Sequence, residues 1–345
     1  MSRHVGILTG GGDAPGLNAV IRAVVKYGVG QKGWLLTGVE DAFDGLIARP
    51  MRLRRLVPRA CGGLLQRGGT ILGTTNRGDP FAWKDGKNHA HDIRVELDRL
   101  GMEGLIVVGG DGTMRIADRL MREEGVPVIG VPKTIDNDLG ATDQTFGFQS
   151  AVDCVTDALD RLHTTAESHD RCIVVEVMGR DAGFIAMHGG IAGGADVILI
   201  PEIPWDLGRL RAKLEQRRNI GRPFSLIVVS ESAHPLGVAD AKGGAGQLVV
   251  NALREAEPDL DIRLTVLGHL QRGGSPDAVD RVLATRFGCC AVDLACADRW
   301  GQMVALRDGH VIGVPLADAV RSNRIVDVAG ELVATARAVG VELGG

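Results

Sequence analysis

Short apolar runs rich in β-branched residues recur along the chain, and most are separated by stretches in which apolar residues return at helical spacing. The runs predict buried strands, and the stretches between them predict amphipathic helices. The runs occupy residues 4–10, 33–39, 104–110, 126–132, 171–178, 195–201, 224–230 and 262–268. Unbroken apolar strands joined by helices form largely parallel sheets that are covered on both faces. The expected fold class is therefore α/β.

Polar, glycine-rich segments stand at the ends of four of these runs. They read GGGDAPG, GGDGT, PKTIDND and MGRDAG, in the order of the chain. Ligands of parallel α/β sheets gather at the carboxyl ends of the strands. The four segments are therefore candidate binding loops.

Composition narrows the class of protein. The chain has 345 residues, 45% of them hydrophobic, and a formal net charge of -4, which predicts a soluble globular protein of two domains or one large α/β unit. Acidic and basic residues are mixed without a basic stripe, so nucleic acid is not expected as a partner. No apolar run approaches the roughly 20 residues that span a bilayer, and the N-terminal sequence lacks a signal pattern. A cytoplasmic protein without a membrane partner is expected.

The six cysteines lack the CxxC spacings of zinc or redox sites, so reduced, buried thiols are expected and no cysteine-bound metal follows. Glycine is abundant, with 49 residues, while aromatic residues are scarce. This composition suits tight turns and close approach of the backbone to phosphate, but does not establish either.

The first candidate loop, GGGDAPGLN, leads from a strand into a helical pattern. Gly11 and Gly12 would let backbone N–H groups approach an anion, and the following helix start adds a favourable dipole end. The loop matches neither the GxGxxG dinucleotide fingerprint nor the P-loop with its GK[ST] ending. A glycine-rich turn at this place is structural about as often as it is functional.

The second candidate loop combines small residues, an acid and a hydroxyl immediately before a helix. Gly110 and Gly112 permit close approach to a polyphosphate, and Asp111 is suited to hold magnesium directly or through water. Thr113 is suited both to cap the helix and to bind the ligand, and the two roles can coexist.

The third loop places Lys133, Thr134, Asp136 and Asp138 within a few residues. Alone, such residues after a strand most often form only a turn.

The motifs taken together resemble the 6-phosphofructokinase family. GGGDAPGLN, GGDGT, PKTIDND, VVEVMGR and LGHLQRGGSPDAVDR occur in that order, from the first strand to near residue 290. TIDND and GHLQRGGSP together are specific, whereas GGDGT alone also occurs in NAD kinases and lipid kinases. The resemblance implies two Rossmann-like βαβ domains with the active site in the cleft between them. It also implies transfer of the ATP γ-phosphoryl group to the 1-hydroxyl of fructose 6-phosphate, which gives fructose 1,6-bisphosphate.

The resemblance gives each polar residue of PKTIDND a role. Asp136 would be the base that takes the proton of the sugar's 1-hydroxyl, and Asp138 would position it or tune its charge. Thr134 would hydrogen-bond the transferring phosphoryl group, and Lys133 would supply charge to that group. Two nearby carboxylates raise each other's pKa unless cations compensate, so Mg²⁺ at Asp111 and the arginines of the site would keep Asp136 ionised.

The same resemblance implies the residues that bind donor and acceptor. Those on the donor side are Gly11, Gly12, Arg77, Gly110, Asp111, Gly112 and Thr113, with Asp111 as the magnesium ligand. Those on the acceptor side are Thr134, Asp136, Arg171, Met178, Gly179, Arg180, Glu231, Arg263, His269 and Arg272. Arg180 also counts among the catalytic residues, and Glu231 would accept bonds from sugar hydroxyls. In the family, residues like Arg171 and Arg263 reach in from a neighbouring subunit, so a homo-oligomer, a dimer or tetramer, is expected.

The donor is the main departure from a single family pattern, because some members use ATP and others pyrophosphate. Gly112 leaves room for the α-phosphate of ATP, where pyrophosphate users usually carry an aspartate. Lys133 conflicts with this, because many bacterial ATP users carry glycine there and pyrophosphate users carry lysine. Gly112 decides for ATP, since a missing side chain permits the nucleotide, whereas the lysine is compatible with either donor. The combination resembles an ATP-dependent subgroup close to the pyrophosphate enzymes.

Two alternatives stay open: the pyrophosphate-dependent reaction on the same sugar, and a catalytically silent subunit that binds sugar phosphate.

Arg77 lies in LGTTNRGDP, where many bacterial ATP enzymes have an arginine followed by an aromatic residue, so its register differs. For the domains, residues 1–146 with about 271–315 would bind the donor, and residues 147–270 with about 316–345 the sugar phosphate.

Overall fold

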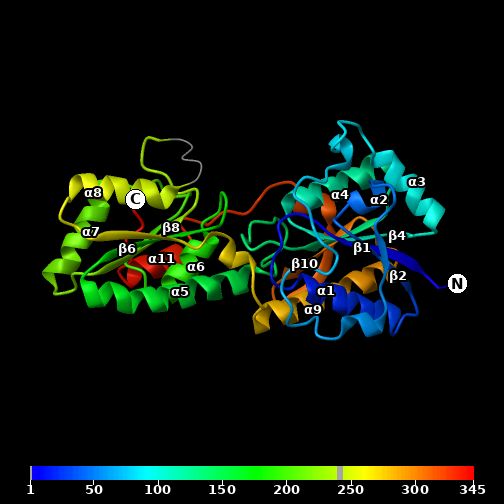
Figure 1. Cartoon of the computed structure of the whole chain (residues 1–345), viewed down its shortest axis with the longest axis horizontal. Helices are drawn as coiled ribbons and strands as arrows, with labels where there is room; N and C mark the ends of the chain where they lie inside the picture. Colours follow the sequence, from blue (N-terminus) through cyan, green and yellow to red (C-terminus); the bar gives the residue numbers. More distant parts are fainter. Residues whose placement is uncertain (1, 239–243) are drawn as a thin grey trace. The chain divides into compact units, whose positions relative to one another are not determined.

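In the computed structural model of the chain, the structure describes residues 2–238 and 244–345, which divide into two compact units (Figure 1). Unit 1 comprises Met1–Thr134, Leu139–Gln149 and Arg272–Asn323. Unit 2 comprises Ile135–Asp138, Ser150–Gln271 and Arg324–Gly345. The chain therefore passes between the units several times.

Apart from shifts of up to three residues, the limits of the units differ from the expected domain limits at two places. The last segment of unit 1 ends at Asn323 rather than near residue 315. Ile135–Asp138 belongs to unit 2, although the sequence analysis assigned all of residues 1–146 to one domain. Contacts with unit 2 explain the second difference, because the backbone N–H of Arg324 donates to the Asp138 carbonyl at 2.7 Å.

Unit 1 is built on one mixed sheet. Among the described residues it has seven strands in the order β11-β10-β5-β4-β1-β2-β3. The strands are β1 (His4–Thr9), β2 (Leu35–Val39), β3 (Leu53–Arg55), β4 (Gly104–Gly109), β5 (Val128–Pro132), β10 (Gln302–Arg307) and β11 (His310–Pro315). The pairs are parallel except at the two edges, where β3 and β11 run antiparallel to their neighbours.

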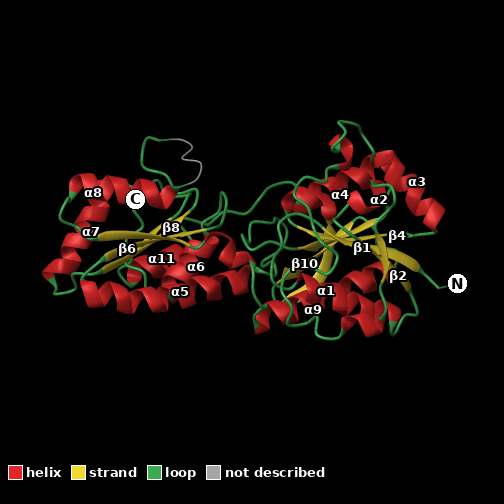
Figure 2. Cartoon of the chain, viewed as in Figure 1, coloured by secondary structure: helices red, strands yellow, loops and turns green. Residues whose placement is uncertain are grey.

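Unit 2 has a smaller, fully parallel sheet. Its order is β7-β8-β6-β9. The strands are β6 (Cys172–Val177), β7 (Val197–Leu199), β8 (Ser225–Ser230) and β9 (Ile262–Val266). Each apolar run of the sequence contains one strand of the two sheets, which confirms the α/β class with mostly parallel sheets (Figure 2).

Three strands were not predicted, and all lie at or beside the edge of the larger sheet. β3 is a three-residue strand with two exposed arginines, so it carries no apolar run. β10 and β11 form a hairpin whose turn residues, Asp308 and Gly309, have φ of 48° and 78°. Positive φ at both central residues is typical of a type I′ turn, for which Asp-Gly is a strong sequence signal. That signal was present in the sequence and was missed.

Helices cover both faces of each sheet, as Figures 1 and 2 show. The α-helices are α1 (Leu17–Val24), α2 (Asp44–Ile47), α3 (Ala90–Leu100), α4 (Asp111–Glu124), α5 (Phe148–His169), α6 (Phe184–Ala192), α7 (Leu207–Asn219), α8 (Ala245–Ala256), α9 (Ala278–Cys296), α10 (Leu316–Ala319) and α11 (Glu331–Ala338). Short π or 3₁₀ segments are η1 (Val25–Val29), η2 (Pro58–Cys61), η3 (Pro80–Ala82) and η4 (Gly268–Arg272).

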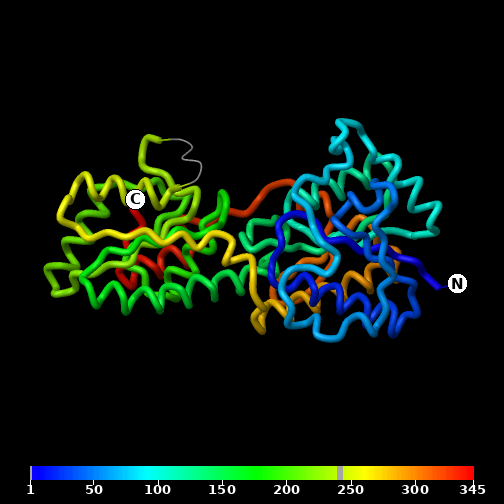
Figure 3. The backbone as a smooth tube through the Cα atoms, in the orientation of Figure 1, coloured from blue at the N-terminus to red at the C-terminus, as the bar shows by residue number. Residues whose placement is uncertain are grey.

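Each face of the unit 1 sheet has its own apolar core. One core joins the sheet to α1 and α9, and the other joins it to α2, α3, α4 and α10. Figure 3 traces the returning segment, in orange, to α9 beside the blue helix α1. In unit 2, α7 and α8 pack on one face and α6 on the other. None of the helices in the described residues is both long enough and apolar enough to cross a membrane.

Candidate active site

Three of the candidate loops meet at the carboxyl ends of the central strands of the unit 1 sheet. Because β5, β4 and β1 are neighbouring parallel strands, the segments after them leave the same edge. The backbone N–H of Gly10 donates to the Val108 carbonyl, and that of Lys133 to the Gly109 carbonyl, both at 2.9 Å. The glycine-rich loops and the start of PKTIDND are thus tied together by their backbones.

Thr113 packs at the centre of these loops. A Cβ on Gly109 would lie 2.4 Å from the Thr113 Cβ, and one on Gly10 would lie 2.9 Å from its Oγ1. Real Cβ atoms do not approach so closely, so glycine is required at both positions. Helix α4 begins at Asp111 with Gly110 as its N-cap. The expectation that Thr113 caps this helix was wrong, because Thr113 lies within the first turn and its side chain is buried between the loops.

Two cations that the sequence assigned to phosphate contact the first loop. Lys133 is a buried residue, and its ammonium donates to the Gly12 carbonyl. The Arg272 guanidinium donates to the Asp13 carbonyl at 3.1 Å. Both positive charges therefore lie beside the loop that would offer backbone N–H groups to an anion.

The loop that carries Arg77 is joined to the same place. The backbone N–H of Gly11 donates to the Thr75 carbonyl at 3.1 Å, and the Thr74 hydroxyl donates to the Gly11 carbonyl at 2.5 Å. Arg77 itself is exposed, and its backbone N–H donates to the Thr75 hydroxyl at 3.1 Å. The structure thus brings the Arg77 loop to the first glycine loop.

The PKTIDND segment is divided between the two units. Lys133 and Thr134 belong to unit 1, and the residues from Ile135 to Asp138 belong to unit 2. Thr134 is held by the buried Thr145 hydroxyl, which donates to its carbonyl at 2.8 Å. Both carboxylates of the segment are buried, with 2% of Asp136 and 6% of Asp138 exposed. A charge at Asp136 therefore depends on nearby donors and cations.

Arg180 supplies such a cation in unit 2. Its Nε lies 3.7 Å from the Asp136 Oδ2, and its side chain is 59% exposed whereas that of Asp136 is 3% exposed. The Arg180 backbone has a φ of 50°, in the left-handed region that non-glycine residues rarely adopt. Such strain persists where the surroundings impose it, and it concentrates at functional sites. The arginine is thus held beside the buried carboxylate with part of its side chain exposed.

Glu231 fixes the turn that carries Arg180. The Glu231 Oε1 accepts the backbone N–H of Gly179 at 3.2 Å and that of Arg180 at 2.9 Å. Gln271, which the sequence analysis did not name, also contacts this loop. Its fully buried Oε1 accepts the Met178 N–H at 3.3 Å. A polar residue within LGHLQRGGSP was the signal that could have found it.

Comparison with known proteins agrees with this arrangement of motifs. The phosphofructokinase family model matches residues 4–295. The chain belongs to the phosphofructokinase family. This confirms the family that the motifs resemble, and the family is one of phosphotransferases.

The chain is similar to relatives named for ATP and to a relative named for pyrophosphate. An ATP-dependent 6-phosphofructokinase of Chloroflexus aurantiacus is 49% identical over 99% of this chain and 98% of its own length. A pyrophosphate–fructose 6-phosphate 1-phosphotransferase of Streptomyces coelicolor is 47% identical over 94% of this chain and 96% of its own. The phosphofructokinase structure from Saccharomyces cerevisiae superposes with a TM-score of 0.84 and 32% identity over 93% of this chain, which spans 45% of the yeast chain.

Family membership gives meaning to the position of Asp111, the first residue of α4. Its carboxylate is 18% exposed and pairs with the Arg115 Nε at 2.8 Å. In the described part of the chain, no group of three or more His, Cys, Asp and Glu residues is suited to a metal. Mg²⁺ is commonly held by one or two carboxylates together with water and substrate phosphates. A single, partly exposed carboxylate beside glycine loops fits that mode of binding.

Arg171 and Arg263 are not brought to the other acceptor residues of the same unit. Arg171 precedes β6, whereas Met178 and Arg180 follow it, and seven extended residues span roughly 23 Å. Arg171 and Arg263 both pair with Asp261, each at 2.8 Å. The hydrogen bond from Arg171, followed by the charges of both arginines, lowers the pKa of the Asp261 carboxyl.

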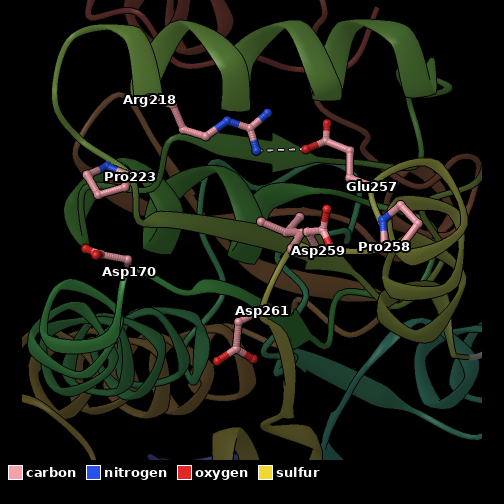
Figure 4. A pocket seen from close by; sticks show the side chains of 8 residues that line it. Asp170, Arg218, Pro223, Glu257, Pro258, Asp259 and Asp261 are labelled. Atoms are coloured by element: carbon pink, nitrogen blue, oxygen red, sulfur yellow. Dashed lines mark hydrogen bonds and ion pairs between the residues drawn. The ribbon is translucent and has the colours of Figure 1, made fainter.

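The cavity beside these arginines is not suited to a sugar phosphate. Its volume is about 440 Å³. It is lined by Asp170, Arg218, Pro223, Glu257, Pro258, Asp259, Leu260 and Asp261 (Figure 4). Among the described residues that line it, the cation is Arg218, which pairs with Glu257 at 2.8 Å. The acidic lining would repel an anion, so the phosphates are expected elsewhere.

The segment that follows the Arg77 loop carries a pH-sensitive contact. The His89 Nε2 lies 2.9 Å from Asp85, and its Nδ1 lies 2.6 Å from Asp92. The hydrogen bond with Asp85, then that with Asp92, raises the pKa of His89 above its ordinary value of 6.5. Protonated His89 therefore stabilises the folded state. This stabilisation is fully present below the pKa of the histidine in the unfolded chain, and it is lost as the pH rises through its pKa in the folded chain.

Replacement of His89 by glutamine is therefore expected to lower the melting temperature at about pH 5.5 and to have little effect at about pH 8.5. Thermal melting of both proteins across this range measures the difference. His310→Gln, at the exposed first position of β11, is the control. A His89→Gln effect that is equal at both ends of the range would contradict the protonated pair.

Proposed function

We propose that the chain transfers the γ-phosphoryl group of ATP to the 1-hydroxyl of fructose 6-phosphate, as an ATP-dependent 6-phosphofructokinase. The observation that supports ATP as the donor is the open space at Gly112. Gly112 is exposed, and a Cβ built on it meets no atom within 4 Å among the described residues. Open space beside Asp111 at the start of α4 suits a triphosphate, whose charge a helix N-terminus favours.

In the proposed reaction the donor binds at the unit 1 loops. Backbone N–H groups of the glycine loops and the charge of Lys133 would stabilise the phosphates. The donor residues are Gly11, Gly12, Arg77, Gly110, Asp111, Gly112 and Thr113. Asp111 would hold Mg²⁺, which when bound neutralises phosphate charge. Thr134 would hydrogen-bond the transferring group.

Asp136 would take the proton of the sugar 1-hydroxyl while that oxygen bonds to the γ-phosphorus and the bond to ADP breaks. Its burial beside Arg180 supports this role, because a nearby cation favours the charged form of a carboxylate that is shielded from water. Asp138 would position Asp136 or tune its charge. The acceptor residues are Arg171, Met178, Gly179, Arg180, Glu231, Arg263, His269 and Arg272.

The distant position of Arg171 and Arg263 supports a homo-oligomer, a dimer or tetramer, in which these arginines complete a neighbour's site. Both are partly exposed; Arg171 precedes β6 and Arg263 is the second residue of β9, whereas Arg180 follows β6. A planar guanidinium bonds two phosphate oxygens at once. A cytoplasmic location and the absence of nucleic-acid and membrane partners stay predictions of the sequence.

The pyrophosphate-dependent reaction is the second candidate, because Lys133 and the relative from Streptomyces coelicolor favour it. Initial rates with fructose 6-phosphate and magnesium, measured with each donor, separate the two. The expected result is turnover with ATP alone. Turnover with pyrophosphate alone would make Lys133 the better guide, and no turnover with either would favour a silent binding subunit.

A further inference from the structure

Asp44 is a buried carboxylate that lies outside every motif of the family resemblance. It is the first residue of α2, and its side chain is 2% exposed. The Trp83 Nε1 donates to its Oδ1 at 2.9 Å, and the Lys84 Nζ lies 2.5 Å from its Oδ2. A carboxylate is buried at great cost unless it is paired and hydrogen-bonded. Asp44 therefore holds Trp83 and Lys84, at the end of the loop that carries Arg77.

Gly78 packs against the same carboxylate. A Cβ on Gly78 would lie 2.7 Å from the Asp44 Oδ1, so the chain beside Arg77 runs directly over it. The other end of this loop is fixed by Thr74 and its neighbour through the hydrogen bonds with Gly11. Arg77 thus stands on a loop that is anchored on one side by the first glycine loop and on the other by Asp44.

We propose that Asp44 is a positioning residue for the donor, which acts by holding the loop of residues 74–84 so that Arg77 meets the donor phosphates. This proposal rests on the proposed function, since it needs Arg77 to contact the donor. Its physical basis is preorganisation: an arginine on a fixed loop loses less conformational freedom on binding, and small displacements of such groups are costly.

The test measures KM for donor and for fructose 6-phosphate in Asp44→Asn and Lys84→Met. Asparagine keeps the shape of Asp44 but removes the charge. Lys84→Met removes one partner at a side chain that is 58% exposed, and so serves where Asp44→Asn fails to fold. Lys87→Met, at an exposed lysine three residues after Lys84, is the matched control. The expected result is about a tenfold rise in donor KM, with KM for the sugar and kcat little changed.

A double-mutant cycle with Arg77→Ala decides whether Asp44 acts through Arg77. If it does, Lys84→Met or Asp44→Asn adds little to the donor KM of the Arg77→Ala protein. Full additivity of the two changes would overturn the proposal. Equal rises in both KM values, or an effect as large in Lys87→Met, would also overturn it.

Limited proteolysis gives a readout that does not depend on the reaction. Trypsin cleavage after Arg77 is expected to become faster in Asp44→Asn and Lys84→Met, because the loop loses its anchor. Faster cleavage with unchanged donor KM would show that the loop is held but not used, which overturns the positioning role. The cycle is run with whichever donor the wild-type protein uses, so that failure of the ATP assignment is distinguished from failure of this proposal.

Discussion

Replacement of Asp136 by asparagine is expected to lower kcat by about 10³-fold, within the range for loss of a general base. Asparagine has the same shape but cannot take the proton of the sugar hydroxyl. The side chain is 3% exposed, so water cannot readily replace it as the base. Initial rates at saturating substrates measure the change.

The control for this variant is Asp118→Asn on α4. Asp118 is also largely buried and pairs with an arginine, Arg122, at 2.8 Å, but it lies outside the motif. Its rates are expected to match those of the wild-type protein. The thermal midpoint of Asp136→Asn should stay near that of the wild type, since the change removes a buried charge and keeps the volume. An Asp136→Asn protein with unchanged kcat would exclude the mechanism whatever the fold.

Replacement of Gly112 by aspartate is expected to lower kcat/KM for ATP by about 100-fold, which corresponds to roughly 2.7 kcal/mol of transition-state stabilisation. The new carboxylate would occupy the open space beside Asp111 and repel the α-phosphate. Stability should be retained, because the position is exposed and an acid in the first turn of a helix is favourable. Steady-state kinetics with ATP and with pyrophosphate, together with thermal melting, measure these effects.

Gly112→Ala separates charge from bulk, since it fills the same space with one methyl group. The alanine variant is expected to keep most of its rate with ATP, while the aspartate variant loses it. If Gly112→Asp used ATP as well as the wild-type protein does, Gly112 would not set the donor. The burial of Lys133 against the first loop would then be the feature to test next.

The sequence predicted the strands well because burial in a parallel sheet demands unbroken apolar runs, and such runs are visible without knowledge of any contact. β10 and β11 escaped this criterion, since they form an edge hairpin with one half-exposed strand. Their turn, at Asp308 and Gly309, is a local signal and was readable. The expected cap at Thr113 failed for a different reason: Gly110 already begins the helix, and contacts with distant glycines bury the threonine.

The sequence by itself determined the fold class, the family and the order of the candidate loops, because apolar periodicity and contiguous motifs are local properties of the chain. Only the tertiary structure decided how these residues are used. It divided PKTIDND between two units, placed Lys133 and Arg272 on backbone carbonyls, and separated Arg171 from Arg180. It also brought Asp44 to Trp83 and Lys84, a pairing between residues far apart in the chain. Such pairings depend on how strands order themselves in the sheet and on which polar groups burial forces together, and no local pattern records either.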